Sequence, residues 1–220
     1  MSRIIFAVLT IALLFSNVPA LVAQDSPPDE AAWSKAVNLL ALIDPNKDTV
    51  AGKWTIQDGK LMAESTMRSR LQIPFAPPKD YDFRIVFSRP EKTDIIGQML
   101  SRGDNAVMWV ITCSKGSPLG FGMVSGMSAR SNTTTVRNDS GLEPGRPHAS
   151  ILQIRRKGAK AFLNGKLVCQ WKTNWTDASL HTEWDIPNHR LLGLGTSGPA
   201  IFHKVDLIEV IGKGTPSRRK

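Results

Sequence analysis

The chain has 220 residues, of which 41% are hydrophobic and 21% charged, an ordinary composition for a globular domain with one substantial core. Its formal net charge is +9, yet no zinc-ligand spacing, RNA-binding aromatic signature or recognition-helix pattern accompanies that charge. These numbers exclude a disordered or fibrous chain, and they give no reason to expect a nucleic-acid partner.

The first residues have the pattern of a secretory signal. Arg3 supplies a positive start, residues 4–15 are almost entirely apolar, and small residues precede a polar break. We expect a signal peptide over residues 1–23, cleaved after Ala23 or, as second choice, after Ala20; an uncleaved anchor is the alternative. No later segment is long enough to span a membrane. The protein is therefore expected to be exported to the periplasm, the cell surface or the medium.

The next segment leads into a β-rich chain. Residues 24–36 are polar and contain prolines, which predicts a linker or a short helix. Residues 53–64 (KWTIQDGKLMAE) predict a tight hairpin, because Asp58 and Gly59 form a favoured two-residue turn between two strand-like runs.

The middle of the chain predicts three longer strands followed by loops. Residues 81–89 alternate so that Phe83, Ile85 and Phe87 share one buried face. Two further strands are expected: IIGQMLS before the RGDN turn and AVMWVITC after it. The segment 116–147 is rich in Gly, Ser, Thr and Asn, which predicts long loops of the kind that carry binding sites.

Residues 150–171 (SILQIRRKGAKAFLNGKLVCQW) predict a three-stranded meander. Its turns are Lys157-Gly158 and Asn164-Gly165, and the second has the residues that a type I′ hairpin prefers. An uninterrupted register from that turn would place four side chains on one apolar face: Phe162, Leu167, Cys169 and Trp171.

The two cysteines lie in predicted strands. In an oxidising compartment Cys113 and Cys169 can form a disulfide. As separate thiols they would pack as small hydrophobic side chains. The sequence leaves both interpretations open, because it does not give the distance between the two Cα atoms.

The end of the chain completes the pattern. Residues 189–198 and 199–212 predict two closing strands, and residues 213–220 (KGTPSRRK) predict a basic flexible tail. We find no sustained helical periodicity and no internal repeat. Many short strands separated by turns predict a single all-β domain, a sandwich or a barrel.

The strand-turn-strand meander with LNGK at its second turn, followed by LLGLGTSGPAIFHKVDLIEV, resembles the concanavalin A-like (laminin G-like) domains. The resemblance implies a two-sheet antiparallel jelly-roll sandwich over residues 37–212. KWTIQDGKLMAE and YDFRIVFSR are similar to the start of one branch, the exported 3-keto-disaccharide hydrolase-type domain of planctomycete-like bacteria. In that branch Trp54 and Asp58-Gly59 would open the domain.

The chain departs from that branch at its functional positions. The branch has a glutamine and a histidine in the turn before its final strand and an Arg-Asn pair within the strand, whereas this chain has GLGTSGPA and IFHKVDLIEV. Arg102 is only a loose counterpart of the arginine that follows the branch's Asn-Ser-Gly segment. We therefore favour a noncatalytic module that binds carbohydrate or a cell-surface glycan. A 3-keto-glycoside hydrolase and a structural envelope protein are the alternatives.

The candidate catalytic residues are Glu183 and Asp185, which would point to the same face of a strand. Retaining glycosidases of the concanavalin-like class carry a Glu-x-Asp-x-x-Glu strand with two catalytic glutamates. Here Asn188 holds the third position, and Pro187 argues against a continuing central strand. The pattern favours a polar pair at the rim over a catalytic pair.

The candidate glycan contacts are tryptophans with polar neighbours, because sugars stack their apolar faces on aromatic rings and pair their hydroxyls with amides and carboxylates. Two groups lie in loop-rich sequence: Trp175 with Asn174 and Asp177, and Trp184 with Glu183. Packing over a sheet edge is the alternative for both tryptophans.

Only one pair suggests a calcium site. Asp104 and Asn105 precede a predicted strand and would supply oxygen ligands for Ca²⁺. No other cofactor is expected.

Overall fold

The computed structural model describes residues 26–64, 66–90, 93–114, 116–137 and 141–218. The predicted signal peptide lies outside the described residues. Within the described ranges, no helix combines the length and the apolar composition needed to cross a bilayer.

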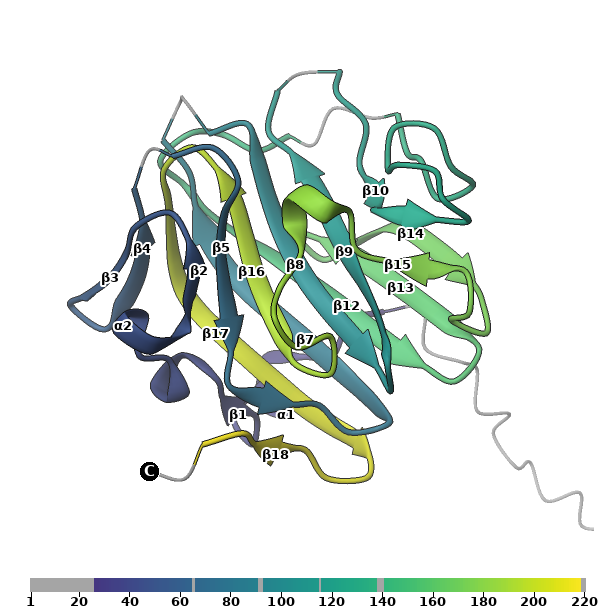
Figure 1. The fold of residues 1–220 in the computed structure, drawn as a ribbon, viewed down its shortest axis with the longest axis horizontal. Coiled ribbons are helices and arrows are strands. Elements are labelled where there is room, and N and C mark those ends of the chain that lie inside the picture. Colours follow the sequence, from purple (N-terminus) through teal and green to yellow (C-terminus); the bar gives the residue numbers. More distant parts are fainter. Residues whose placement is uncertain (1–25, 65, 91–92, 115, 138–140, 219–220) are drawn as a thin grey trace, which may run out of the picture.

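Two antiparallel sheets pack face to face around the core (Figure 1). Sheet 1 has the order β14-β13-β12-β7-β17-β4-β3, with β1 also paired to β17. Its strands are β1 (Val37–Asn38), β3 (Trp54–Gln57), β4 (Lys60–Ala63), β7 (Asp80–Ser88), β12 (Pro147–Arg155), β13 (Gly158–Leu163), β14 (Lys166–Lys172) and β17 (Ala200–Ile211).

Sheet 2 has the order β10-β9-β8-β16-β5-β2. Its strands are β2 (Thr49–Ala51), β5 (Ser69–Ile73), β8 (Ile95–Arg102), β9 (Asn105–Thr112), β10 (Gly120–Phe121) and β16 (Leu192–Ser197). Two small strand pairs complete the β structure: β6 (Phe75–Ala76) with β18 (Thr215–Pro216), and β11 (Met123–Val124) with β15 (Ala178–Ser179). The helical elements are α1 (Glu30–Trp33), η1 (Leu40–Leu42), α2 (Pro45–Asp48) and η2 (Thr182–Trp184).

The core confirms the alternation that the sequence predicts. Phe83, Ile85 and Phe87 on β7 are fully buried between the sheets, as are Phe202 and Leu207 on the neighbouring β17. The predicted fold class, an all-β two-sheet antiparallel jelly-roll sandwich, is confirmed.

Both predicted two-residue turns have the expected backbone. Asp58 and Gly59 have φ values of 51° and 70°, and Asn164 and Gly165 have φ values of 48° and 80°. Positive φ at both positions is the mark of a type I′ turn, whose twist matches that of the flanking strands.

The predicted face of the second hairpin is wrong beyond its turn. Phe162 pairs with Leu167, but Ala161 pairs with Cys169, so Val168 is an extra residue that forms a β-bulge. The bulge reverses the alternation of β14. Cys169 and Trp171, which follow the bulge, therefore point into the core. Phe162, which pairs with β14 before the bulge, packs on the outer face of sheet 1.

Both cysteines are buried free thiols. Burial raises the pKa of the Cys113 thiol to about 12 and that of the Cys169 thiol to about 11. Of the two interpretations left open by the sequence, the structure contains the separate, protonated thiols.

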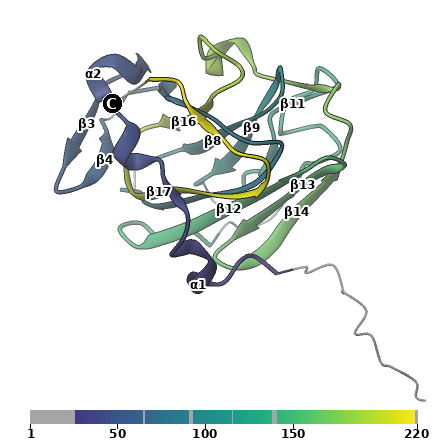
Figure 2. The same cartoon turned by 90° about the horizontal axis from the view of Figure 1, so that it is seen from below.

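The N-terminal part of the described chain lies against the outer face of sheet 1 (Figure 2). Asp29 caps α1, and the Arg84 guanidinium stacks 4.2 Å from the centre of the Trp33 ring. The same guanidinium pairs with Glu30 at 2.8 Å and Asp206 at 2.7 Å. This buried arginine fixes the segment to the sheet.

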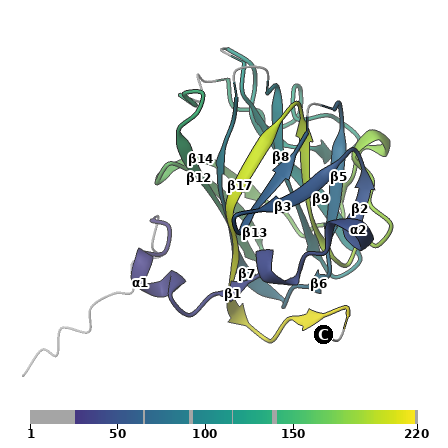
Figure 3. The same cartoon turned by 90° about the vertical axis from the view of Figure 1, so that its left-hand side faces the viewer.

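The C-terminal segment is not a free tail as far as Arg218. Its strand β18 pairs with β6, so the segment lies against one end of the sandwich (Figure 3). The Arg218 guanidinium binds both carboxylate oxygens of the buried Asp48 and the Leu42 carbonyl oxygen. The prediction of a flexible tail over 213–220 is thus wrong for 213–218, because a buried carboxylate on α2 requires a cationic partner.

Candidate functional site

A groove of about 310 Å³ lies on the outer face of sheet 2. One side is formed by the segment that contains η2, which lies in front of β16 and β8 (Figure 1), and the other by the loops around residues 118–130. Six of the residues that line the groove carry its charged and aromatic groups: Arg68, Asp94, Arg130, His181, Glu183 and Trp184. The volume is near the lower end of the range for small-ligand sites.

Gly195 on β16 lies under the Trp184 ring beside the groove, and because glycine has no side chain the ring can lie close to the sheet. A Cβ on Gly195 would lie 2.9 Å from Cζ3 of Trp184 and 3.1 Å from Cε of Met99. Trp184 is half-buried and packs against the apolar cluster formed by Met99, Met108 and Ile186. The absence of a side chain at Gly195 therefore decides the position of the ring beside the groove.

Two arginines at the start of β5, Arg68 just before the strand and Arg70 within it, hold the η2 segment in place. Arg68 Nη1 lies 2.7 Å from Glu183 Oε1, and Arg70 donates a hydrogen bond to the Glu183 carbonyl oxygen. Arg68 has a positive φ of 56°, and its backbone N–H donates to Ser197 Oγ at 3.2 Å. This links β5, β16 and the η2 segment at one end of the groove.

His181 caps η2 from the other side. Its Nδ1 accepts a hydrogen bond of 3.2 Å from the Glu183 backbone N–H, which makes Nδ1 the unprotonated nitrogen. The same Nδ1 lies 3.9 Å from Glu183 Oε2. The groove thus presents an imidazole, a carboxylate and a guanidinium next to an indole ring.

These groups suit the recognition of a polar ligand that has an apolar face. The indole offers an apolar surface, and the charged groups donate and accept hydrogen bonds around it. Within the described ranges, no three His, Cys, Asp or Glu side chains form a cluster that would hold a metal ion.

The structure separates the two predicted catalytic carboxylates. Glu183 belongs to the 3-10 helix η2 and Asp185 is its C-cap, so neither lies on the expected strand. Glu183 faces Arg68 in the groove, whereas Asp185 pairs with His189 Nε2 at 2.6 Å. Sequence spacing alone failed here because a helical turn sends residues two apart in different directions.

The structure also separates the two predicted tryptophan groups. Trp175 is 2% exposed, its ring packs 5.4 Å from that of Trp171, and its Nε1 donates to the Arg155 carbonyl oxygen. A ring buried in this way has no free face for a sugar, so the predicted contact at Trp175 is wrong. Asn174 and Asp177 make turn hydrogen bonds, to Thr176 and Thr173, in the same loop outside the groove.

The predicted calcium pair also lies elsewhere. Asp104 is exposed and forms an ion pair with Arg190, and Asn105 begins β9 opposite Arg102. Neither residue lines the groove.

His181, the N-cap of η2, was not predicted as a site residue, and neither were three further charged residues of the groove: Arg68, Asp94 and Arg130. They come from three loops that are distant in sequence, and no local motif joins them. The positive φ of Arg68 is also not visible in the sequence, because only glycine and asparagine signal that backbone region reliably.

No protein-family profile and no curated protein sequence matches the chain. Solved structures do share its fold. The carbohydrate-binding module CBM66 from Bacillus subtilis is 13% identical with a TM-score of 0.53, covering 72% of this chain and 92% of its own. A proposed glycosyl hydrolase from Parabacteroides distasonis is 11% identical with a TM-score of 0.54, covering 85% and 100%.

A third similar structure is the exoplasmic/lumenal domain of VIP36 in its Ca²⁺/Man3GlcNAc-bound form. It is 9% identical with a TM-score of 0.52 and covers 78% of this chain and 89% of its own. At such low identities these similarities establish the sandwich fold, and they leave function to the site.

Proposed function

We propose that the protein is an exported, noncatalytic module that binds a neutral oligosaccharide in the groove on sheet 2. The observation that carries the proposal is Trp184, held half-buried over Gly195 with Glu183, Arg68 and His181 around it. One or two sugar rings would stack on the indole and pair their hydroxyls with these charged groups. The three similar structures, a carbohydrate-binding module among them, support a glycan as the ligand.

Export is part of the proposal and rests on the signal pattern of residues 1–23.

Binding is favoured over hydrolysis because both carboxylates of the groove already have partners within the protein. Glu183 is paired with Arg68, and Asp94 accepts a hydrogen bond from Ser114 Oγ at 3.1 Å. A hydrolase needs one carboxyl group that holds a proton for the leaving oxygen. The Arg68 guanidinium already occupies Glu183 Oε1, so this carboxylate is not free to face a leaving oxygen. The 3-keto-glycoside hydrolase remains the competing function.

The test is calorimetric titration of the full chain with neutral oligosaccharides and 3-keto-glucosides, with chromatography of the ligand afterwards. We expect saturable binding of an intact ligand. Trp184→Ala should weaken it by at least about tenfold, as the removal of a central aromatic contact does. Cleavage of the ligand that is lost in Glu183→Gln would instead establish a hydrolase.

Matched controls separate the groove from general destabilisation. Asp185→Asn lies two residues from Glu183→Gln but outside the groove, and should bind like the wild type. Asn174→Ala tests the loop that contains the buried Trp175 and should also leave binding unchanged. If Trp184→Ala binds normally, or if both controls lose binding as Trp184→Ala does, the groove is not the glycan site.

A further inference from the structure

The positive charge of the chain is concentrated at one edge of sheet 1. From Pro147 to Thr176 the sequence contains six lysines and arginines and no aspartate or glutamate. These residues form β12, β13 and β14, the last of which is the edge strand. This edge therefore carries +6 in a chain whose net charge is +9.

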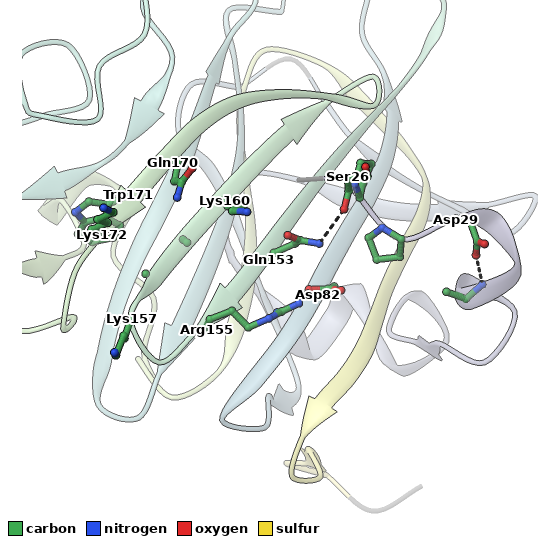
Figure 4. A pocket seen from close by; sticks show the side chains of 15 residues that line it. Ser26, Asp29, Asp82, Gln153, Arg155, Lys157, Lys160, Gln170, Trp171 and Lys172 are labelled. Carbon is green, nitrogen blue, oxygen red and sulfur yellow. Dashed lines mark hydrogen bonds and ion pairs between the residues drawn. The ribbon is translucent and has the colours of Figure 1, made fainter. Parts of the chain in front are cut away.

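A second groove, of about 840 Å³, lies on the outer face of this edge (Figure 4). Its far wall is the segment Ser26–Ala32 that leads into and begins α1. That wall is fixed, because Trp33 Nε1 donates to the Pro28 carbonyl oxygen and Arg84 pairs with Glu30. The groove proposed above to bind a glycan, called the glycan groove from here on, lies on the outer face of sheet 2, so the two grooves are on opposite sides of the sandwich.

Two rows of cross-strand neighbours form the floor of this second groove. The first row is Gln153, Lys160 and Gln170, and the second is Arg155, Gly158 and Lys172. Cross-strand neighbours lie about 5 Å apart. A Cβ on Gly158 would lie 2.1 Å from the Trp171 carbonyl oxygen, so this position must be glycine, and it leaves a gap between the Arg155 and Lys172 side chains.

The groove keeps an excess of positive charge. Arg155 pairs with Asp82 at 2.7 Å, and Asp29 accepts the backbone N–H of Ala32 at the start of α1. Lys157 and Lys172 are exposed, and in the described part of the chain no carboxylate forms an ion pair with either of them. The floor therefore offers ammonium and amide donors to a ligand, while Asp82 and Asp29 already have partners within the protein.

We propose that this groove binds an acidic polysaccharide, one whose carboxylate or sulfate groups lie along an extended chain. Its anionic groups would pair with Lys157 and Lys172, and its hydroxyls would pair with the Gln153 and Gln170 amides. The flat, open floor of two parallel rows suits an extended polymer better than a small enclosed anion.

Other polyanions suit the groove less well. Trp171 is the aromatic residue among those that line it, and its ring is buried in the core 5.1 Å from that of Phe121. Nucleic acid bases would therefore have no ring to stack on. The apolar side chains that line the groove are Pro27, Pro28, Ala32 and Ala159, too small to insert into a lipid surface.

The test is binding of the full chain to polygalacturonate and dextran sulfate at low salt, with uncharged dextran, a single-stranded oligonucleotide and phosphatidylglycerol vesicles as competing probes. We expect at least one acidic polysaccharide to bind more tightly than the oligonucleotide and the vesicles. Lys157→Gln/Lys172→Gln should weaken that binding about tenfold, and added salt should weaken it further.

The matched control is Lys60→Gln/Lys79→Gln, which removes the same charge from exposed positions elsewhere and should change binding by less than about twofold. Equal losses in the two double variants would overturn the proposal, and so would tighter binding to the oligonucleotide or the vesicles, or no binding to either acidic polymer. Trp184→Ala should leave this binding intact, which separates it from the glycan groove.

Discussion

Single residues set the shape of the groove on sheet 2, and Gly195 is the clearest case. Its φ is unexceptional, so the requirement for glycine comes from the indole of Trp184 lying where a side chain would be. Gly195→Ala should displace the ring, cost about 1 kcal/mol of stability and raise the exposure of tryptophan. Urea denaturation and acrylamide quenching of tryptophan fluorescence measure the two effects.

Gly97 provides the comparison, because it pairs directly with Gly195 across β8 and β16. A Cβ there would meet the terminal methyl of Met108 and not Trp184. Gly97→Ala should therefore change the quenching much less than Gly195→Ala does, since a methionine end can move aside. Equal quenching in wild type and Gly195→Ala would show that the ring does not depend on the glycine.

At the scale of elements, the β13–β14 hairpin depends on its turn and on the strand beside it. Asn164 Oδ1 accepts the Ala149 N–H at 3.0 Å, and its Nδ2 donates to His148 Nδ1 at 3.1 Å. Asn164→Ala should lower the free energy of unfolding by about 2 kcal/mol, for two reasons. Alanine cannot make these hydrogen bonds, and it is disfavoured at the positive φ of this position.

Asn164→Gly separates the two contributions. Glycine accepts the positive φ, so only the side-chain bonds to β12 are lost and the cost should be about 1 kcal/mol. Urea denaturation of both variants gives the values. If the two variants were equally stable, the strain of the left-handed backbone would contribute nothing here.

The same hairpin shows what an element leaves undetermined. Two adjacent residues, Asn164 and Gly165, are enough to predict its turn, but no adjacent residues predict the bulge at Val168. In the folded chain Val168 and Cys169 both pack toward the main core, and Phe162 packs with Trp33 and Ile151 on the outer face. The contacts that select the bulge come from other strands and from α1, so a local pattern cannot contain them.

At the scale of the whole molecule, the C-terminal segment is joined to α2, which is distant in sequence. Arg218 lies 170 residues from Asp48, and the Asp48 side chain is 6% exposed. Arg218→Ala should lower the free energy of unfolding by about 2 kcal/mol, less than for a fully buried pair because the arginine side chain is partly exposed. Thermal and urea denaturation measure this loss.

Lys213→Ala is the control for the same segment. Its ammonium pairs with Glu209 at the surface, with 86% of the lysine side chain exposed, so its removal should change stability by less than about 1 kcal/mol. A loss as large as that of Arg218→Ala would mean that the segment is held by general charge and not by the Asp48 contact.

The sequence by itself determined most of the strands, the two type I′ turns and the all-β class of this protein, whereas the two-sheet jelly roll was implied by the family resemblance. These depend on alternation and on residues adjacent in the chain, such as Asn164 and Gly165, which act over a few residues. Only the tertiary structure decided which tryptophan is accessible, which carboxylate faces the groove and where the basic edge lies. Trp175 and Trp184 have similar neighbours in sequence, but Trp175 packs on Trp171 and Trp184 packs over Gly195. Burial depends on strands that meet from distant parts of the chain, and no local pattern of residues specifies those meetings.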